Sequence, residues 1–533
     1  MRRLPQQLYT AEQVRQLDRL AIGGVADHPG IDGFELMGRA ADAAFSRLLQ
    51  SYPQLDQDAG MQVFCGAGNN GGDGYLIAAL ASERRISVSV TALKHPDELT
   101  GDARKAFEYC SSKGIRIALW CDESAVTGEI LVDAMLGTGL SGEVRGDYRR
   151  AIEALNHSGK PVVAVDIPSG LCADTGAVLG AAVQAELTVT FIGTKQGLLT
   201  GDGPQLCGTL HFTDLDVPAV VYNRLKPSSI RLDKSALKEL MAPRKRTAHK
   251  GDYGHVLIIG GNHGMPGAVI MAAEAAISCG AGKVTVATRP EHLPALAIRR
   301  PEVMAVGVGS RVDLQSLLHD KTVIVAGPGI GTDSWAYDLV DEALNADVPV
   351  VLDADALNLL SEHSQLRRAR KFPMMLTPHP GEAARLLKTD TGSVQKDRFA
   401  AVASLSATYN ACVVLKGAGS LIQYEQQTSL CSAGNPGMAV AGMGDVLSGV
   451  IGALLAQNLP VYDAARLGVW LHASGADTLA WQQGETGLLA TDTIPFIRQQ
   501  LNELTGQAVK NRGSIVADDA QSYARKSDAE TCT

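Results

Sequence analysis

The sequence predicts an α/β protein with two successive units, each built on a largely parallel sheet that helices cover on both faces. Short, almost continuously apolar runs alternate with longer amphipathic stretches in both halves of the chain, and buried parallel strands show this pattern. Many of these runs end in glycine-rich or acidic turns. With 533 residues, the chain is long enough for two or three domains.

The first unit is expected to cover residues 1–218. Thr10 and Gln13 have the spacing of a capping box, which predicts the start of a helix. Apolar runs predict strands at 61–65, 86–93, 130–134, 162–167 and 187–192. Because the strands are separated by helical stretches, we expect a Rossmann-like three-layer αβα arrangement.

Residues 219–250 are expected to connect the units, and their basic run 244–246 has the character of a solvated linker. The second unit is expected over residues 251–505. Its predicted strands are 255–260, 283–287, 322–326, 348–352, 374–377, 411–415 and 420–423, and its predicted helices are 267–278, 396–408, 445–456 and 464–479. Residues 506–533 are polar and are expected to form a disordered tail.

Composition excludes several classes of protein. The net charge is −9 and no basic stripe is present, which argues against a nucleic-acid partner. No apolar run approaches the roughly 20 residues that cross a membrane, and the N-terminus lacks the apolar core of a signal peptide. The nine cysteines have no metal-type spacing, so we expect reduced thiols in a cytoplasmic protein.

The first group of candidate site residues lies in the segment 66–74, which contains five glycines. Glycines let the backbone turn and approach a ligand closely, and the N-terminus of the following helix offers free N–H groups to a phosphate. Asn69, Asn70 and Asp73 add polar side chains to the same turn. A tight structural turn needs only one or two glycines, so the segment predicts ligand binding.

Three later strand ends carry polar residues. Asp133 precedes a glycine turn, Asp166 precedes Ser169, and Lys195 follows the last of these strands. Ligands of open α/β sheets bind beyond the carboxyl ends of the strands. We therefore expect these side chains to meet the Asn-rich loop in one crevice.

Together these segments resemble the NAD(P)H-hydrate epimerase family over roughly residues 8–217. The resemblance implies that Asp166 contacts the nicotinamide ring and acts as base or acid, with Lys195 beside the ring. It also implies a K⁺ ion held by Asn70, Asp133 and Ser169, whose oxygen atoms suit a hard cation. The implied substrate contacts, besides Asp166, are Asn69, Asn70, Gly71, Gly72, Asp73, Gly137, Thr138, Gly139, Leu140, Ser141, Gly142 and Glu143.

The second unit has its own candidate segments at strand ends. Asp353 and Asp355 follow one strand, and His379 follows another and stands between two prolines that fix its direction. The strongest signal is the stretch 434–449, in which a glycine-rich turn runs into a helix that carries Asp445 in its first turn. Backbone N–H groups can hold phosphate there while the carboxylate faces the reacting group.

The Gly-Met-Gly-Asp element at 442–445 is shared with ribokinase-like small-molecule kinases. The full set resembles the ADP-dependent NAD(P)H-hydrate dehydratase family, which has a ribokinase-like fold, over roughly residues 235–505. The resemblance implies that Asp445 acts in the proton transfers, that Gly329, Thr377 and His379 bind substrate with it, and that Mg²⁺ accompanies the nucleotide. The implied ADP contacts are Lys416, Gly417, Ala418, Gly419, Ser420, Asn435, Pro436, Gly437, Met438, Ala439, Val440, Ala441, Gly442, Met443 and Gly444.

One departure from the family pattern precedes Gly442, where a small hydroxyl residue or glycine and then another glycine are usual. This chain has Val440 and Ala441 instead. Val440 offers no hydroxyl to a phosphate, and Ala441 adds a methyl group. We expect backbone N–H contacts to preserve function. The affinity for the nucleotide is the property that these two residues put in doubt.

The two resemblances together imply a repair enzyme for hydrated NADH and NADPH. The first unit would interconvert the R and S forms, and the second would remove water from the S form across C5–C6 of the ring with ADP as co-substrate. We expect only small-molecule partners and a homo-oligomer. Two alternatives remain: a ribokinase-like small-molecule kinase with a regulatory first unit, and a nucleotide-binding module without turnover.

Overall fold

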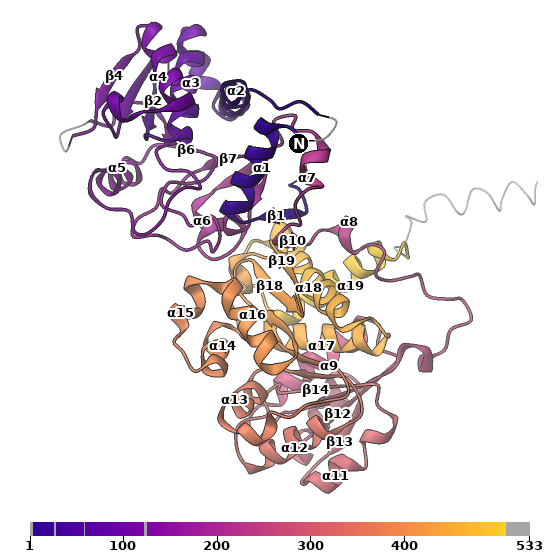
Figure 1. Ribbon diagram of the computed structural model, residues 1–533. Coiled ribbons are helices and arrows are strands. Elements are labelled where there is room, and N and C mark those ends of the chain that lie inside the picture. The colour runs from indigo at the N-terminus through magenta and orange to yellow at the C-terminus, as the bar shows by residue number, and fades with distance from the viewer. Residues whose placement is uncertain (1–3, 26–27, 58, 122–124, 508–533) are drawn as a thin grey trace, which may run out of the picture.

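A computed structural model describes residues 4–25, 28–57, 59–121 and 125–507 of the chain. Within these residues the strands form one sheet of seven strands and one of 12 strands (Figure 1). No helix in the described ranges is long and apolar enough to cross a membrane. From residue 508 on, the expected disordered tail lies outside the described residues.

The seven-stranded sheet belongs to the first unit, and all of its neighbouring strands are parallel, in the order β4-β3-β2-β5-β6-β7-β9. Its strands are β2 (Met61–Cys65), β3 (Val88–Ala92), β4 (Arg116–Leu119), β5 (Ile130–Ala134), β6 (Val162–Val165), β7 (Leu187–Phe191) and β9 (Thr209–Thr213). One face packs against α1 (Ala11–Gly23), α2 (Gly33–Ser51), α3 (Asn69–Glu83) and α4 (Gly101–Ser112). The other face packs against α5 (Gly146–His157). The short helices α6 (Gly203–Leu206) and α7 (Ala219–Tyr222) follow.

The central strands of the second sheet run parallel from β13 to β17 and then turn antiparallel through β18 and β19. They are β11 (His255–Ile259), β12 (Lys283–Thr288), β13 (Met304–Gly307), β14 (Val323–Ala326), β15 (Val350–Leu352), β16 (Met374–Leu376), β17 (Cys412–Leu415), β18 (Ser420–Tyr424) and β19 (Gln427–Cys431).

Helices cover both faces of this second sheet. One face packs against α9 (Pro266–Ser278), α17 (Met443–Ala456), α18 (Val461–Gln483) and α19 (Thr493–Leu504). The other packs against α12 (Ser334–Asn345), α13 (Asp355–Glu362), α14 (Pro380–Leu387) and α16 (Arg398–Tyr409). Shorter helices are α8 (Lys234–Leu237), α10 (Leu293–Arg299), α11 (Arg311–Gln315) and α15 (Thr391–Lys396).

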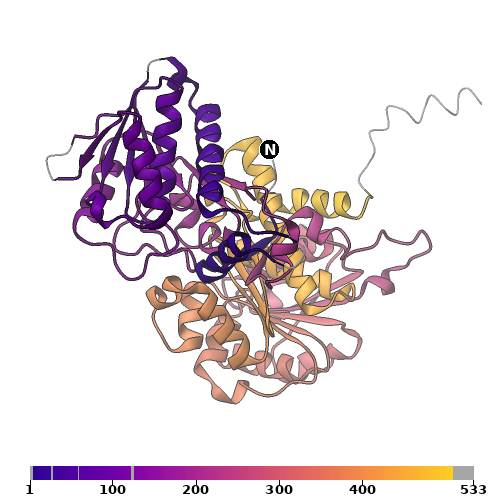
Figure 2. The same cartoon turned by 45° about the horizontal axis from the view of Figure 1, so that its top comes forward.

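Three short strands join the two units. β10 (Ser229–Arg231) lies parallel to β19, β1 (Gln7–Tyr9) lies antiparallel to β10, and β8 (Thr194–Lys195) lies parallel to β1. Segments of the first unit thus extend the sheet of the second, at the junction seen in both views (Figure 1, Figure 2). The expectation of a plain connection over residues 219–250 misses β10, because a strand of three residues has no periodic signature. The basic run 244–246 is exposed, as the linker interpretation expects.

The predicted α/β class, with two successive units whose largely parallel sheets are covered by helices on both faces, is confirmed. The capping box of Thr10 and Gln13 forms as expected. Strands expected at 61–65 and 130–134 coincide with β2 and β5. The core is continuous across the junction, because Leu8, Leu198 and Leu199 pack in the same apolar cluster as β11 and β14.

Candidate functional site

A cavity of about 580 Å³ opens at the carboxyl ends of β2, β5, β6 and β7 in the first unit. Parallel strands of an open sheet place their ligands at this edge. Sequence-predicted residues that line it are Asn69, Asn70, Asp73, Gly137, Thr138, Gly139, Leu140, Ser141, Asp166 and Lys195. The structure therefore brings together residues from four separate strand ends.

Gly71 and Gly72 do not line this cavity, although the sequence pointed to them as substrate contacts. A Cβ atom on Gly71 would lie 2.1 Å from the Gly66 carbonyl oxygen, and one on Gly72 would lie 2.7 Å from the Met37 sulfur. These two glycines therefore allow α3 to pack closely on its neighbours. Gly142 and Glu143 likewise lie outside the lining of the cavity.

Asp166 occupies the end of β6 with a positive φ of 68°, a region that non-glycine residues rarely adopt. Such strain is stored where the surrounding structure fixes it, often at functional sites. One carboxylate oxygen accepts hydrogen bonds from the Phe191 N–H (3.3 Å) and from the Lys195 ammonium. Lys195 is 0% exposed and also donates to the Thr190 hydroxyl (3.0 Å). The carboxylate is thus held against a buried positive charge while it faces the cavity.

Two further carboxyl groups surround this ion pair. Burial raises the pKa of Asp18 to about 6, and the negative charge of Asp166 acts in the same direction. Burial also raises the pKa of Asp73, with smaller contributions from Asp166 and Asp18. The cavity therefore brings the carboxyl groups of Asp18 and Asp73 close to the Asp166–Lys195 ion pair, which is a suitable set for moving a proton near neutral pH. Sequence reasoning missed Asp18, because it lies in the middle of α1 and far from any glycine turn.

The three residues expected to hold K⁺ meet around the turn 135–137. Both polar side-chain atoms of Asn70 are buried without a hydrogen-bond partner, and Asn70 lies against Gly137. Asp133 is 0% exposed and accepts hydrogen bonds from the Ser169 hydroxyl (2.6 Å) and the Ser169 N–H (2.7 Å). No basic side chain in the described ranges pairs with Asp133, whose pKa burial raises to about 6. An orphaned amide oxygen beside an uncompensated buried carboxylate fits a monovalent cation.

In the second unit, Lys416, Asp353 and Asp445 gather at the strand ends. The Lys416 ammonium lies 2.8 Å from an Asp353 oxygen and 3.8 Å from a Glu382 oxygen. A Cβ atom on Gly444 would lie 3.3 Å from the ammonium and 3.4 Å from Asp353, so the turn before Asp445 rests directly on this ion pair. Burial alone would lower the pKa of Lys416, but Asp353 and Glu382 raise it above its ordinary value.

Asp445 stands in the first turn of α17, as expected from the sequence. Burial raises the pKa of its carboxyl group to about 7, and the neighbouring charge of Asp353 adds to the effect. A carboxyl group with this pKa is present in both protonation states at neutral pH. It is therefore suited to general acid–base work in a way that an ordinary surface aspartate is not.

His379 caps α14, and its ring nitrogen Nδ1 accepts hydrogen bonds from the N–H groups of Gly381 (3.0 Å) and Glu382 (3.4 Å). The Glu382 carboxylate in turn accepts from the His379 N–H (2.8 Å). Burial lowers the pKa of His379, and the nearby Lys416 charge adds to this effect. Thr377 is 1% exposed, and its hydroxyl donates to the Leu352 carbonyl (3.3 Å), so it supports β15 and β16 from within.

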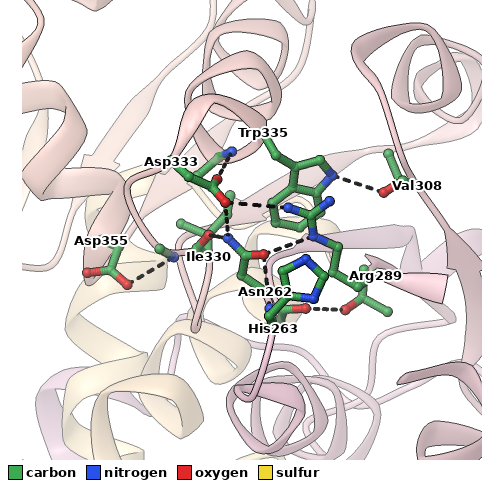
Figure 3. A network of polar contacts seen from close by, with 12 residues as sticks. Asn262, His263, Arg289, Val308, Ile330, Asp333, Trp335 and Asp355 are labelled. Atoms are coloured by element: carbon green, nitrogen blue, oxygen red, sulfur yellow. Dashed lines mark hydrogen bonds and ion pairs between the residues drawn. The ribbon is translucent and has the colours of Figure 1, made fainter. Parts of the chain in front are cut away.

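A network of polar contacts around Asn262 holds the turn at Ile330, the residue after Gly329 (Figure 3). The Asn262 N–H donates to the Gly329 carbonyl (2.7 Å), and the Asn262 side chain donates to the Ile330 carbonyl (3.0 Å). The Arg289 guanidinium donates to the Asn262 side-chain oxygen (2.9 Å) and stacks 4.1 Å from the Trp335 ring centroid. Sequence reasoning found Gly329 but not Asn262 or Arg289, which belong to other strand ends.

The glycine turn before α17 is built from locally fixed backbone. Asn435 accepts from the Gly437 N–H (3.1 Å) and donates to Asp477 (2.9 Å), a residue of α18 that sequence reasoning missed. Gly442 has a φ of 94°, and a Cβ atom there would lie 2.6 Å from the Met271 sulfur. Val440 and Ala441 are exposed. The strained position is therefore Gly442, and the methyl group of Ala441 is accommodated without a positive φ.

Comparisons with known proteins agree with this division into two sites. A family model described as YjeF-related protein N-terminus matches residues 33–197, and one described as NAD(P)H-hydrate dehydratase matches residues 256–499. Among solved structures, the ADP/ATP-dependent NAD(P)H-hydrate dehydratase from Bacillus subtilis co-crystallised with ATP/Mg²⁺ is 28% identical, with a TM-score of 0.48, over 51% of this chain and 97% of that chain.

Curated relatives match almost the whole length. The chain is 46% identical to the bifunctional NAD(P)H-hydrate repair enzyme Nnr of Coxiella burnetii over 93% of this chain and 99% of the relative. It is 41% identical to the enzyme of the same name from Vibrio cholerae over 94% of this chain and 99% of the relative. The resemblance that the sequence motifs indicated is confirmed, and the chain belongs to the family of bifunctional NAD(P)H-hydrate repair enzymes.

Proposed function

We propose that the first unit, residues 1–218, interconverts the R and S forms of hydrated NADH and NADPH, and that the second, residues 251–505, dehydrates the S form with ADP. The observation that carries this proposal is the pairing of carboxyl and ammonium groups at two separate strand-end sites. Asp166 lies against buried Lys195 in one site, and Asp445 lies beside the Lys416–Asp353 pair in the other. Each site can therefore exchange a proton independently of the other.

In the first site, Asp166 takes and returns the proton during epimerisation. Its hydrogen bonds to the Phe191 N–H and to Lys195 fix the carboxylate in one orientation. The apolar side chains of Met37, Phe191 and Ile192 also line the cavity and suit a flat ring. The polar loop 137–141 forms another wall of the cavity and is the part that we assign to the substrate's polar groups.

Asn70, Asp133 and Ser169 hold K⁺ in this proposal. When bound, the cation compensates the buried charge of Asp133 and supplies a fixed positive field beside the substrate. The chain's own contribution is the position of the ligands. Asp133 fixes Ser169 through two hydrogen bonds, and Asn70 presents an otherwise unpartnered side-chain oxygen.

In the second site, Asp445 moves the proton as water leaves across C5–C6 of the ring. The Gly329, Thr377 and His379 segments hold the substrate, while residues 416–420 and 435–444 receive ADP. Mg²⁺ accompanies the nucleotide and neutralises its phosphate charge. The glycine turn leads into the N-terminus of α17, where backbone N–H groups are free to bind phosphate.

The proposal also covers the cellular location and the oligomeric state of the whole protein. We expect the enzyme to act in the cytoplasm and to assemble as a homo-oligomer. Among the described cysteines none forms a disulfide, which is compatible with a reducing compartment.

The test of this function follows the absorbance of reduced nicotinamide after the protein is added to a mixture of both hydrated NADH epimers with ADP and Mg²⁺. We expect full recovery. Recovery of reduced nicotinamide from the S form alone would refute epimerisation by the first unit. No recovery with ADP or ATP, together with phosphate transfer from ATP to a small alcohol, would replace the repair function by the small-molecule kinase alternative.

A further inference from the structure

The loop at residues 416–420 is in direct contact with the first unit. Thr200 is 0% exposed and follows the 3₁₀ turn η3 (Gln196–Leu199), which begins directly after Lys195. Its hydroxyl oxygen lies 3.1 Å from the Ala418 carbonyl oxygen and 3.1 Å from that of Gly419. The Gly201 N–H also donates to the Ala418 carbonyl (3.3 Å). Groups of the first unit therefore satisfy the backbone of a loop in the second.

Arg398, the first residue of α16, contacts both Thr200 and the same loop. It is 1% exposed, and its Nε donates to the Thr200 hydroxyl (3.1 Å). Its Nη2 donates to the carbonyl groups of Leu415 (3.3 Å) and Lys416 (3.2 Å), and its Nη1 donates to Gln395 (2.7 Å). All of these acceptors are uncharged. No carboxylate in the described part of the chain is paired with this guanidinium. Burying such a charge is costly, and the loop carbonyl groups and the Thr200 hydroxyl are among the groups that compensate it.

Two glycines of the loop are required by these contacts. Gly419 has a φ of 64°, and a Cβ atom there would lie 2.0 Å from the Leu199 carbonyl oxygen of the first unit. Gly417 has a φ of 138°, and a Cβ atom there would lie 2.9 Å from Arg398 Nη1. The shape of the loop therefore depends on the first unit as well as on its own sequence.

We propose that Thr200 and Arg398 are positioning residues that hold residues 416–420 in the shape that receives ADP, so that the first unit completes the nucleotide site of the second. This inference rests on the proposed function, in which that loop binds ADP. Lys416 begins the loop, and its ammonium lies 2.8 Å from Asp353.

The experiment uses the full chain and three single variants. Thr200→Val removes the hydroxyl and keeps the shape, and Thr200→Ser keeps the hydroxyl. Thr188→Val is the matched control, because Thr188 is equally buried and its hydroxyl donates only within the first unit, to the Cys207 carbonyl (2.8 Å). For each protein we would measure the Kd of ADP by calorimetry, the KM for ADP and kcat of dehydration, the epimerisation rate and the Tm.

We expect Thr200→Val to weaken ADP binding and raise the KM for ADP about tenfold, since it leaves a charged buried donor without its acceptor. The kcat at saturating ADP should change by less than about twofold, because the lost interaction affects binding alone. Thr200→Ser and Thr188→Val should bind ADP like the unmodified chain, and all variants should epimerise normally.

A fourth single variant, Arg398→Lys, keeps the charge and loses the planar fork, so it should also raise the KM for ADP. Combined with Thr200→Val it should add little, because the two residues act on one loop. Unchanged ADP affinity in Thr200→Val, or a drop in Tm shared with Thr188→Val and no change in ADP binding, would overturn the inference. A complete failure of the unmodified chain to bind ADP would instead refute the proposed nucleotide site.

Discussion

Replacing Asp445 by Asn should stop dehydration and leave epimerisation intact. The amide has almost the same shape as the carboxyl group, so substrate and ADP should still bind. It cannot take up and release the proton, however. In the proposed function, epimerisation depends on Asp166, which follows β6 of the seven-stranded sheet, and on its ion-pair partner Lys195, so the change should not reach that site.

The size of the expected loss follows from the pKa of Asp445. Burial raises that pKa to about 7, so roughly half of the molecules carry the proton at neutral pH. A positioned acid–base group with a pKa near the working pH contributes about 10²–10⁴-fold to the rate. The variant should therefore lose this factor, which corresponds to about 3–5 kcal/mol of transition-state stabilisation.

The same reasoning gives the pH dependence. A plot of the dehydration rate against pH should change slope near pH 7 in the unmodified chain, because Asp445 titrates there. Asp353 raises that pKa through its negative charge, so Asp353→Asn should move the change of slope to lower pH. In Asp445→Asn the change of slope should be absent.

The assay follows recovery of reduced-nicotinamide absorbance from the hydrated S form with saturating ADP, over a range of pH. Epimer exchange is measured separately by chromatography on the same protein preparation. A variant Asp445→Asn that dehydrates within about tenfold of the unmodified chain would refute the role of Asp445 as acid or base. So would a pH profile that is the same in both proteins.

Four other expectations follow. Asp166→Asn should slow epimerisation by at least about 10²-fold and leave dehydration of the S form unchanged; normal epimer exchange would move the catalytic role elsewhere. Exchange of K⁺ for Na⁺ should lower epimerisation in the unmodified chain but not in Asn70→Ala, and equal rates in the two salts would count against the cation site. Gly71→Ala should destabilise the fold by about 1–3 kcal/mol in urea unfolding, because its Cβ would meet the Gly66 carbonyl at 2.1 Å, whereas Gly139→Ala has open space and should unfold normally. Asp18→Asn should alter the epimerisation rate mainly near pH 6, where burial places the pKa of that carboxyl group, and an unchanged profile there would exclude Asp18 from the proton transfers.

Much of the fold could be predicted because it is written in local patterns. The strands β2 and β5 coincide with their predicted ranges, since fully buried parallel strands are continuous apolar runs bounded by polar turns. The short strands β1, β8 and β10 could not be predicted. Each has two or three residues, and each is fixed by pairing with a partner far away in the chain.

The sequence by itself predicted which turns carry the chemistry, those at Asn69 and Gly442, and which carboxyl groups belong to them, those of Asp166 and Asp445. Glycine turns and acidic strand ends are local features, and the carboxyl ends of parallel strands necessarily meet at one edge. Only the tertiary structure decided that Asp18 joins Asp166 and that Thr200 holds the loop of the other unit. These contacts link residues with no common periodicity, and burial, which raises the pKa of Asp18, exists only once the two sheets have formed.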